Sequence, residues 1–235
     1  MNKHYIHDTT IHNLQDPMQV WPEVLKFIKP KSVLDVGCGT GTWLKALESF
    51  GINEYIGVDG DYVVKQDLVI SHDKFIASDL KEPLQLNQRF DLVISLEVAE
   101  HLPESSADNF VKTLITHGEI ILFSAAIPNQ GGQYHLNERW IKYWEEKFNA
   151  HGYYLHDIIR PLIWENERIH WWYRQNIFLV TTNKNETPVL SLVHPSCFTE
   201  RINAYEASYK ALANGQVGLR QSGKIFIKAL KQFLS

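Results

Sequence analysis

VLDVGCGTGTW, residues 33–43, joins an apolar run of strand type to three glycines and then to a segment of helical composition. Glycine accepts positive φ and lets another group approach the main chain closely, so this stretch predicts a sharp turn against a ligand. Glycine-rich turns between a strand and a helix serve many nucleotide-like cofactors, so the turn alone does not say which one binds. The segments that follow the turn must therefore indicate which cofactor binds.

Strand-type runs alternate with helix-type segments over about 32–182. The runs are SVLDVG, YIGVDG, FIASDL, FDLVISL, EIILFSA, YYLHDII and NIFLVTT. Several are almost continuous in apolar residues, which is typical of strands that are covered on both faces. The alternation predicts an α/β fold with a Rossmann-like, doubly wound, seven-stranded sheet. Helices are expected over 14–28, ahead of the sheet, and over 105–114 and 138–150.

The length of 235 residues suits one large domain with an appendage. The composition changes at NKNETP, so we expect a domain over 1–184 and a C-terminal helical extension over 185–235. The last expected helix is amphipathic, with lysines on one face and large apolar side chains on the opposite one: Lys224, Lys228 and Lys231 against Phe226, Leu230 and Phe233. Two interpretations stay open. The apolar face packs on the core or on a second subunit, giving a homodimer, or the helix lies on a membrane surface.

The overall composition is that of an ordinary globular protein, with 44% hydrophobic residues and a formal net charge of -4. This charge gives no positive field for a nucleic-acid backbone, so no nucleic-acid partner is expected. No apolar stretch reaches the length of a transmembrane helix, and the N-terminus is polar. The two cysteines, Cys38 and Cys197, are far apart and do not indicate a disulfide framework. Together these features favour a cytoplasmic protein.

Carboxylates follow the next two strand-type runs. Asp59 ends the second run, about 20 residues after the glycines, where an adenosine ribose would present its hydroxyl groups. Asp79 and Leu80 end the third run, in the position for an adenine amine and one ring face. Each aspartate alone could equally be a turn or cap residue. The ordered series favours an adenosine-containing cofactor.

In this order and spacing, VLDVGCGTGTW, GVDGD, ASDL and FDLVISLEVAEHLP resemble the class I S-adenosylmethionine-dependent methyltransferases, over about 20–182. Within them the chain is similar to the group called methyltransferase domain type 23, and to bacterial members with SLEVAEHLP, HLNERW and WYRQN segments. The resemblance implies S-adenosylmethionine as cofactor and a strand order 3-2-1-4-5-7-6 with the last strand antiparallel. Carried over by position, the cofactor contacts are Asp35, Gly37, Cys38, Gly39, Gly41, Asp59, Gly60, Asp79, Leu80 and Ser95.

The fourth run ends in SLEVAEHLPE, where Glu97, Glu100 and His101 stand at i, i+3 and i+4. A helical turn would point all three to one side, at the edge of the sheet where ligands bind. His135, after the next run, is a further candidate. The pattern resembles the divalent-metal site of small-RNA 2′-O-methyltransferases and ubiquinone-pathway O-methyltransferases, which implies Mg²⁺ or another divalent cation on Glu97, Glu100, His101 and His135. In the metal-free alternative, the Glu is a structural acceptor and His101 is a substrate contact or the general base. The catalytic candidates are His101, Glu97 and Glu100.

The acceptor is expected at RPLIWENERIHWWYRQN, between the last two strands, on Trp164, Trp171, Trp172 and Arg174. Aromatic platforms with arginine suit a sugar or a nucleotide-linked substrate, while the competing interpretation is that these aromatics belong to the core. We therefore expect methyl transfer to a hydroxyl of a carbohydrate or glycoconjugate precursor. The alternatives are an N-methyltransferase, a quinone or phenol O-methyltransferase, and a cofactor-binding partner subunit without chemistry.

Overall fold

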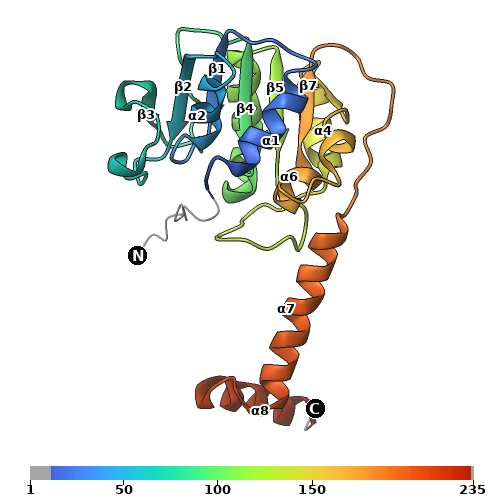
Figure 1. Ribbon diagram of the computed structural model, residues 1–235. Helices are drawn as coiled ribbons and strands as arrows, with labels where there is room; N and C mark the ends of the chain where they lie inside the picture. The colour runs from blue at the N-terminus through green and yellow to red at the C-terminus, as the bar shows by residue number, and fades with distance from the viewer. Residues whose placement is uncertain (1–11, 234–235) are drawn as a thin grey trace. The chain divides into compact units, whose positions relative to one another are not determined.

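The computed structural model describes residues 12–233 and contains one seven-stranded sheet (Figure 1). The order is β3-β2-β1-β4-β5-β7-β6, and β7 runs antiparallel to both β5 and β6. This confirms the expected topology. The strands are β1 Ser32–Val36, β2 Glu54–Asp59, β3 Phe75–Ala77, β4 Leu92–Leu96, β5 Ile120–Ser124, β6 Tyr154–His156 and β7 Phe178–Thr181. The first eleven residues, which hold most of the polar N-terminus, lie outside the described part.

Helices connect the strands close to the expected positions. In chain order they are α1 Gln15–Val24, α2 Thr42–Glu48, α3 Ala107–His117, α4 Ile141–Asn149, α5 Arg160–Ile163, α6 Trp171–Asn176, α7 Pro195–Ala213 and α8 Leu219–Phe233. Short 3-10 turns add η1 Lys65–Asp67, η2 His72–Lys74, η3 Ala99–His101 and η4 Glu104–Ser106. The segment 160–176, where the acceptor was expected, folds as the short helices α5 and α6, which are too brief to show a helical period in the sequence.

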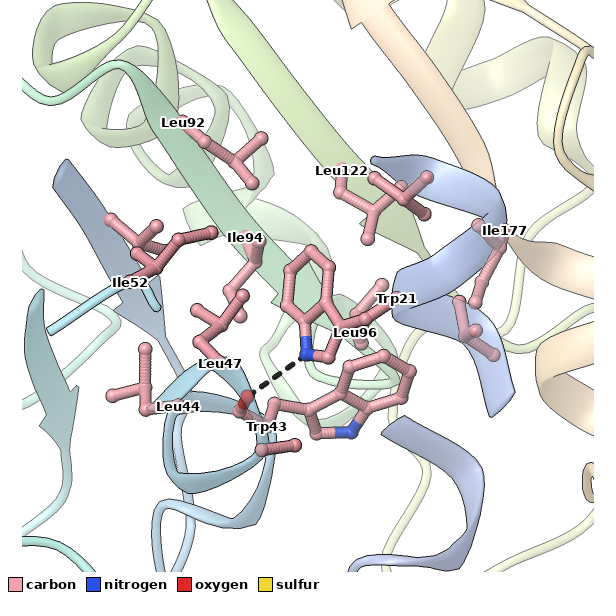
Figure 2. Packing of buried hydrophobic residues seen from close by; sticks show 14 of the residues in the cluster. Trp21, Trp43, Leu44, Leu47, Ile52, Leu92, Ile94, Leu96, Leu122 and Ile177 are labelled. Atoms are coloured by element: carbon pink, nitrogen blue, oxygen red, sulfur yellow. Dashed lines mark hydrogen bonds between the residues drawn. The ribbon is translucent and has the colours of Figure 1, made fainter. Parts of the chain in front are cut away.

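Two apolar layers cover the sheet. On one face, α1 and α2 pack over the central strands, and Trp21 of α1 is fully buried among Ile94, Leu96 and Leu122 (Figure 2). Its indole Nε1 donates a hydrogen bond to the main-chain oxygen of Trp43 at 3.0 Å. On the other face, α3 and α4 contribute side chains such as Phe110, Trp144 and Phe148. Helices on both faces leave the carboxyl edge of the parallel strands as the place for a ligand.

The chain consists of two compact units, Met1–His194 and Pro195–Ser235. The first holds the whole sheet. The second holds α7 and α8, within the stretch 185–235 where a helical extension was expected. None of the helices in residues 12–233 has the length and apolarity that crossing a bilayer requires.

Candidate active site

The turn after β1 is built in a way that only glycine allows at two positions. Gly37 has φ +93°, and a Cβ there would lie 2.3 Å from a methyl carbon of Val98. Gly41 has φ +87°, and its Cβ would lie 2.8 Å from Ile70. The main-chain N–H groups of Gly37 and Cys38 donate to the carbonyl of Val58 at 2.8 and 3.1 Å, which holds the turn against the end of β2. Larger residues would push this turn open.

Asp59, at the end of β2, joins the turn to its own strand. Its Oδ2 accepts a hydrogen bond from the Gly39 N–H at 2.7 Å, and its Oδ1 accepts from the Gly60 N–H at 2.6 Å and from the Tyr62 hydroxyl at 2.7 Å. Asp59 thus holds the glycine turn in its conformation, and it lies at the carboxyl end of β2, where the cofactor is expected. A carboxylate offers about four acceptor positions, so ribose hydroxyls can bind at the remaining one or in place of Tyr62. Tyr62 carried no signal in the sequence.

Asp35 and Cys38 are buried beside Asp59. Burial, together with the charge of Asp59, raises the pKa of the Asp35 carboxyl well above its usual value. Burial raises the pKa of the Cys38 thiol well above its usual value too, with the charges of Asp35 and Asp59 adding to the shift. A thiol that keeps its proton is a poor nucleophile, so Cys38 acts here as a small packing residue. Ser95, in the middle of β4, is fully buried.

The third expected cofactor position is more open. Asp79 lies two residues beyond β3, is largely exposed, and pairs with Lys81 through an Nζ to Oδ2 distance of 3.0 Å. Leu80 next to it is half-buried. The three carboxyl ends of β1, β2 and β3 are neighbours in the sheet, so the glycine turn, Asp59 and Asp79 line the same edge. Three glycines that admit close approach, a buried carboxylate for hydroxyls and a half-buried apolar side chain suit an adenosine cofactor.

Glu97, directly after β4, differs from the expectation that it shares a helical face with Glu100 and His101. Its φ is +56°, and its N–H donates to the Ser124 hydroxyl at 2.9 Å. The His101 N–H bonds to the carbonyl of Val98 at 2.9 Å, so the turn η3 begins after Glu97. Because the chain is left-handed at Glu97, this side chain leaves the series that the spacing predicted.

The Glu97 carboxylate is held by two amide groups. Its Oε2 accepts from Gln130 Nε2 at 2.8 Å, and its Oε1 accepts from Asn176 Nδ2 at 3.1 Å. Gln130 lies in the loop between β5 and α4, and Asn176 ends α6. Glu97 therefore connects three segments that line this edge of the sheet. The sequence did not single out either amide.

Glu100, His101 and His135 do come together. Each offers one ligand atom to a group in which all such atoms lie within 4.8 Å of one another. The loop that carries His135 is fastened to the turn η3, because the N–H groups of Leu136 and Asn137 donate to the carbonyl of Glu100 at 2.7 and 3.0 Å. The long loop after β5 thus returns to the end of β4. Glu97 is not a member of this group.

Electrostatics distinguish this cluster from an ordinary polar surface. Glu100 is fully buried, and neither of its carboxylate oxygens meets hydrogen-bond geometry with any residue of 12–233. Burial, and then the charge of Glu97, raise its pKa well above the usual value, while the main-chain N–H groups of Glu100 and Ala126, which lie nearby but outside good hydrogen-bond geometry, offset the shift only in part. Burial likewise raises the pKa of Glu97 to about 7, against the hydrogen bonds from Asn176, Ser124 and Gln130. An orphaned buried carboxylate beside two imidazoles fits a divalent cation.

Glu138 is a further residue of the site that the sequence pattern did not reveal. Its Oε1 lies 2.8 Å from Nδ1 of His135, and its two oxygens also accept from the N–H groups of Asn129 and Gly131. A carboxylate on one imidazole nitrogen orients the ring and leaves the other nitrogen for a ligand. The His-x-x-Glu spacing in HLNE was the available signal.

The four residues expected to bind the acceptor divide into two pairs. Trp171 and Arg174 are 7% exposed, and Arg174 Nη1 donates to the main-chain oxygen of Trp164 at 2.9 Å. Burial lowers the pKa of the Arg174 guanidinium. Trp164 and Trp172 are half-buried, and Trp172 stacks on His170 at 4.3 Å between ring centroids. The first pair belongs to the packing of the insert, and the second retains accessible surface.

The insert is also fixed to the cofactor turn and to the N-terminal helix. Tyr173 meets Trp43, which follows the glycines, edge to face at 5.1 Å. Asp16 at the start of α1 accepts from the His170 N–H at 2.7 Å, and its other oxygen lies 2.7 Å from the His170 Nδ1. The insert, the turn and α1 therefore form one wall of the site.

A family model described as a methyltransferase domain matches residues 10–173, well over half of the chain. The chain belongs to this methyltransferase family. Its family and its fold are those of the S-adenosylmethionine-dependent methyltransferases. The glycine turn and Asp59 lie at the sheet edge where the resemblance expected the cofactor.

Curated relatives of the methyltransferase match parts of it. The ubiquinone biosynthesis O-methyltransferase of Paraburkholderia phymatum is 26% identical over 130 residues, which are 51% of this chain and 54% of that protein. The tRNA U34 carboxymethyltransferase of Hydrogenovibrio crunogenus is 27% identical over 194 residues, which are 69% of this chain and 58% of that protein. The chain thus spans little more than half the length of the curated relatives it matches.

Solved structures share the fold of the methyltransferase. The methyltransferase domain of bacterial CtHen1 gives a TM-score of 0.54 at 20% identity and covers 73% of this chain and 100% of that one. The plantazolicin methyltransferase BpumL in complex with SAH gives 0.51 at 15% identity, with 72% and 83% covered. A Clostridium acetobutylicum S-adenosylmethionine-dependent methyltransferase gives 0.53 at 11% identity, with 76% and 93% covered. At these identities the likeness concerns the fold.

Proposed function

We propose that the methyltransferase transfers its methyl group to a hydroxyl oxygen, at a divalent cation held by Glu100, His101 and His135. The observation that carries this proposal is the buried, unsatisfied carboxylate of Glu100 within 4.8 Å of ligand atoms on the two histidines. Three protein ligands leave positions open for an exchangeable group, as catalytic metal sites require. One carboxylate and two imidazoles suit Mg²⁺, Mn²⁺, Fe²⁺ and Zn²⁺, so the ion is named by class.

The reaction explains why a cation belongs beside the cofactor. The bond from sulfur to the methyl carbon breaks, a bond from the acceptor oxygen to that carbon forms, and the hydroxyl proton passes to solvent water or, without an ion, to His101. A divalent ion would act as a Lewis acid on the acceptor hydroxyl. It would lower the pKa of this hydroxyl toward neutrality, so that the oxygen can lose its proton at the pH of the cell. His101, at the end of the turn η3, is placed to hold the departing proton if no ion is present. Positioning of the two reactants supplies much of the remaining rate enhancement.

Two carboxylates support the cluster without joining it. Glu138 orients His135 through its Nδ1, so that the Nε2 is the atom left for a ligand. Glu97 anchors Gln130 and Asn176, and its charge acts on Glu100 next to it. We assign both as positioning residues.

For the acceptor we propose a carbohydrate or glycoconjugate hydroxyl. The accessible aromatic surface of Trp164 and Trp172 supports this choice, because sugars stack their apolar ring faces on aromatic side chains. A phenol is the second candidate, since the curated relatives include a ubiquinone biosynthesis O-methyltransferase. The two differ in acidity: a phenol has a pKa of about 10, so it depends less on a cation than a sugar hydroxyl does.

The test is methyl transfer from labelled S-adenosylmethionine to a panel of sugar nucleotides, glycan extracts and catechols, with and without EDTA. We expect turnover that EDTA abolishes and Mn²⁺ or Mg²⁺ restores. Direct Mn²⁺ titration should show one site that is lost in His135→Ala and kept in the matched control His72→Ala, an exposed histidine far from the cluster in sequence. Full activity in EDTA with no Mn²⁺ site would replace the cation with His101 as general base.

A further inference from the structure

The last helix, α8, separates its side chains into two arcs. Placed at the helical angle of about 100° per residue, Leu219, Phe226, Leu230 and Phe233 fall on one side, with Ile227 at its border. All are exposed, with Leu219 at 94%, Phe226 at 67% and Phe233 at 86%, and the helix has no buried residue in the part described. A solvent-facing helix normally carries polar residues in such positions. Within the described part of its own unit, residues 195–233, this apolar arc is therefore not covered.

The opposite arc is strongly cationic. Between Leu219 and Phe233 the helix carries Arg220, Lys224, Lys228 and Lys231 and no acidic residue. The chain as a whole has a formal net charge of -4, so this concentration of positive charge is local. The neighbouring helix α7 differs, because it mixes both signs, with Glu200 and Glu206 among its basic residues. The four positive charges of α8 thus have no acidic side chain within the helix to pair with.

We propose that α8 docks the methyltransferase on an anionic membrane surface. In this arrangement the apolar arc enters the boundary between headgroups and acyl chains, and the four cations lie on the polar arc, from which their long side chains reach the lipid phosphates. The helix is suited to lie in the surface and not to cross it, because no helix among residues 12–233 is long and apolar enough for a span.

Charge argues for lipid over a second copy of the chain. Two α8 helices packed through their apolar arcs would leave eight cations on their outer arcs with no carboxylate on either helix to pair them. Anionic lipid supplies the missing charge, at about 1 kcal/mol for each Lys or Arg near the surface. The proposal does not depend on the acceptor or on the cation, so it can fail while methyl transfer stands.

The experiment is flotation of the full chain with vesicles of phosphatidylcholine alone and of phosphatidylcholine with about 30% phosphatidylglycerol. We expect binding to the anionic vesicles that falls as salt rises, and much weaker binding to the neutral ones. Lys224→Gln, Lys228→Gln and Lys231→Gln together should lower the partition coefficient about a hundredfold. Phe226→Ser with Phe233→Ser should abolish binding, because the helix then loses its two large aromatic side chains.

The matched control replaces three exposed lysines of the first unit, Lys29, Lys112 and Lys184, with glutamine, which removes the same charge elsewhere. It should bind anionic vesicles like the parent chain. Light scattering after size-exclusion chromatography gives the mass of each variant, and cofactor titration shows that each is folded. Absence of binding to the anionic vesicles, equal loss in the control, or a dimer that only the Phe226 and Phe233 changes dissociate would overturn the membrane proposal.

Discussion

The imidazole rings of His101 and His135 meet edge to face, with their centroids 4.8 Å apart at an interplanar angle of 79°. One ring stands on the turn that ends β4 and the other on the long loop that follows β5. Two main-chain hydrogen bonds to Glu100 hold this loop in place. The contact between the histidines is therefore set by backbone pairing, so conservative changes at the cluster can be tested without unfolding the loop.

Glu138→Gln tests how His135 is oriented. The amide keeps the size of the side chain but loses the charge that holds Nδ1, so we expect Mn²⁺ affinity to fall by about 10-fold to 100-fold. Titration of Mn²⁺ by electron paramagnetic resonance measures it. Glu146→Gln, on the following helix, is the control and should leave the affinity unchanged. Equal affinity in parent and Glu138→Gln would contradict the positioning role.

Replacing Asp59 with alanine should weaken S-adenosylmethionine binding at least tenfold, about 1.4 kcal/mol. The loss has two sources: the ribose loses an acceptor, and the Gly39 and Gly60 N–H groups lose theirs. Calorimetry with the cofactor product measures the affinity. Asp79→Ala, which removes an exposed carboxylate paired with Lys81, should cost less. A larger loss in Asp79→Ala than in Asp59→Ala would reverse this ranking.

The buried carboxyl of Asp35 predicts a pH dependence of stability. In the folded chain its pKa is raised by burial and by the charge of Asp59. Below about pH 4 this carboxyl is protonated in the unfolded chain as well, so it does not change the free energy of unfolding. Above that pH the unfolded chain releases a proton that the folded one keeps, and stability falls. Asp35→Asn removes this term. The gain in unfolding free energy of the variant over the parent should therefore increase from pH 4 to pH 8, by urea denaturation. A gain that shrinks over this range would show a stabilised charge instead.

Trp171→Ala and Trp172→Ala should separate packing from acceptor binding. Trp171 is 7% exposed, and loss of a buried tryptophan costs about 3–5 kcal/mol, so we expect a lower melting temperature. Trp172 is half-buried, stacks on His170 and packs in part against the core, so its loss should raise the acceptor KM, leave cofactor affinity unchanged and lower the melting temperature less than the loss of Trp171. Equal destabilisation by both changes would place Trp172 in the core.

The Cys38 thiol should resist alkylation in the folded protein. Its pKa is raised by burial and by two nearby carboxylates, so little thiolate forms below pH 9. In a Cys197→Ala background we expect iodoacetamide to label Cys38 only after unfolding, and added cofactor to make no difference. Fast labelling of the native chain at pH 8, read by mass spectrometry, would show a thiol that is exposed and ionised.

The sheet could be predicted because each strand carries its own local signal and the family resemblance supplied the order. Gly37 and Gly41 could be predicted as turn residues too, since their positive φ leaves few other residues possible. The arrangement of the polar side chains that follow β4 could be predicted only in part. Spacing predicted a helical face for Glu97, but a left-handed φ there is set by contact with Ser124 on β5, and no local pattern encodes that contact.

The supporting residues were missed for a similar reason. Gln130 and Asn176 are ordinary amides in the sequence, and they gain a role only when the loop and α6 meet Glu97. The aromatic insert showed the opposite problem. Trp171 and Arg174 had the composition of a binding site, yet the short helix α6 turns them inward, and the direction of a six-residue helix is decided by packing.

The bond between Asp16 and His170 has a consequence for how the chain matures during translation. Asp16 leaves the ribosome early, but the groups that satisfy its buried carboxylate stand 154 residues later. Trp21, one turn further along α1, likewise packs against strands β4 and β5, made much later. Until β4 and β5 have been made, the apolar stripe of α1 lacks most of the surface that it covers, and nascent chains that end before β5 expose part of it. Helix α1 is thus made before the strands that bury it and before the residue that pairs with Asp16.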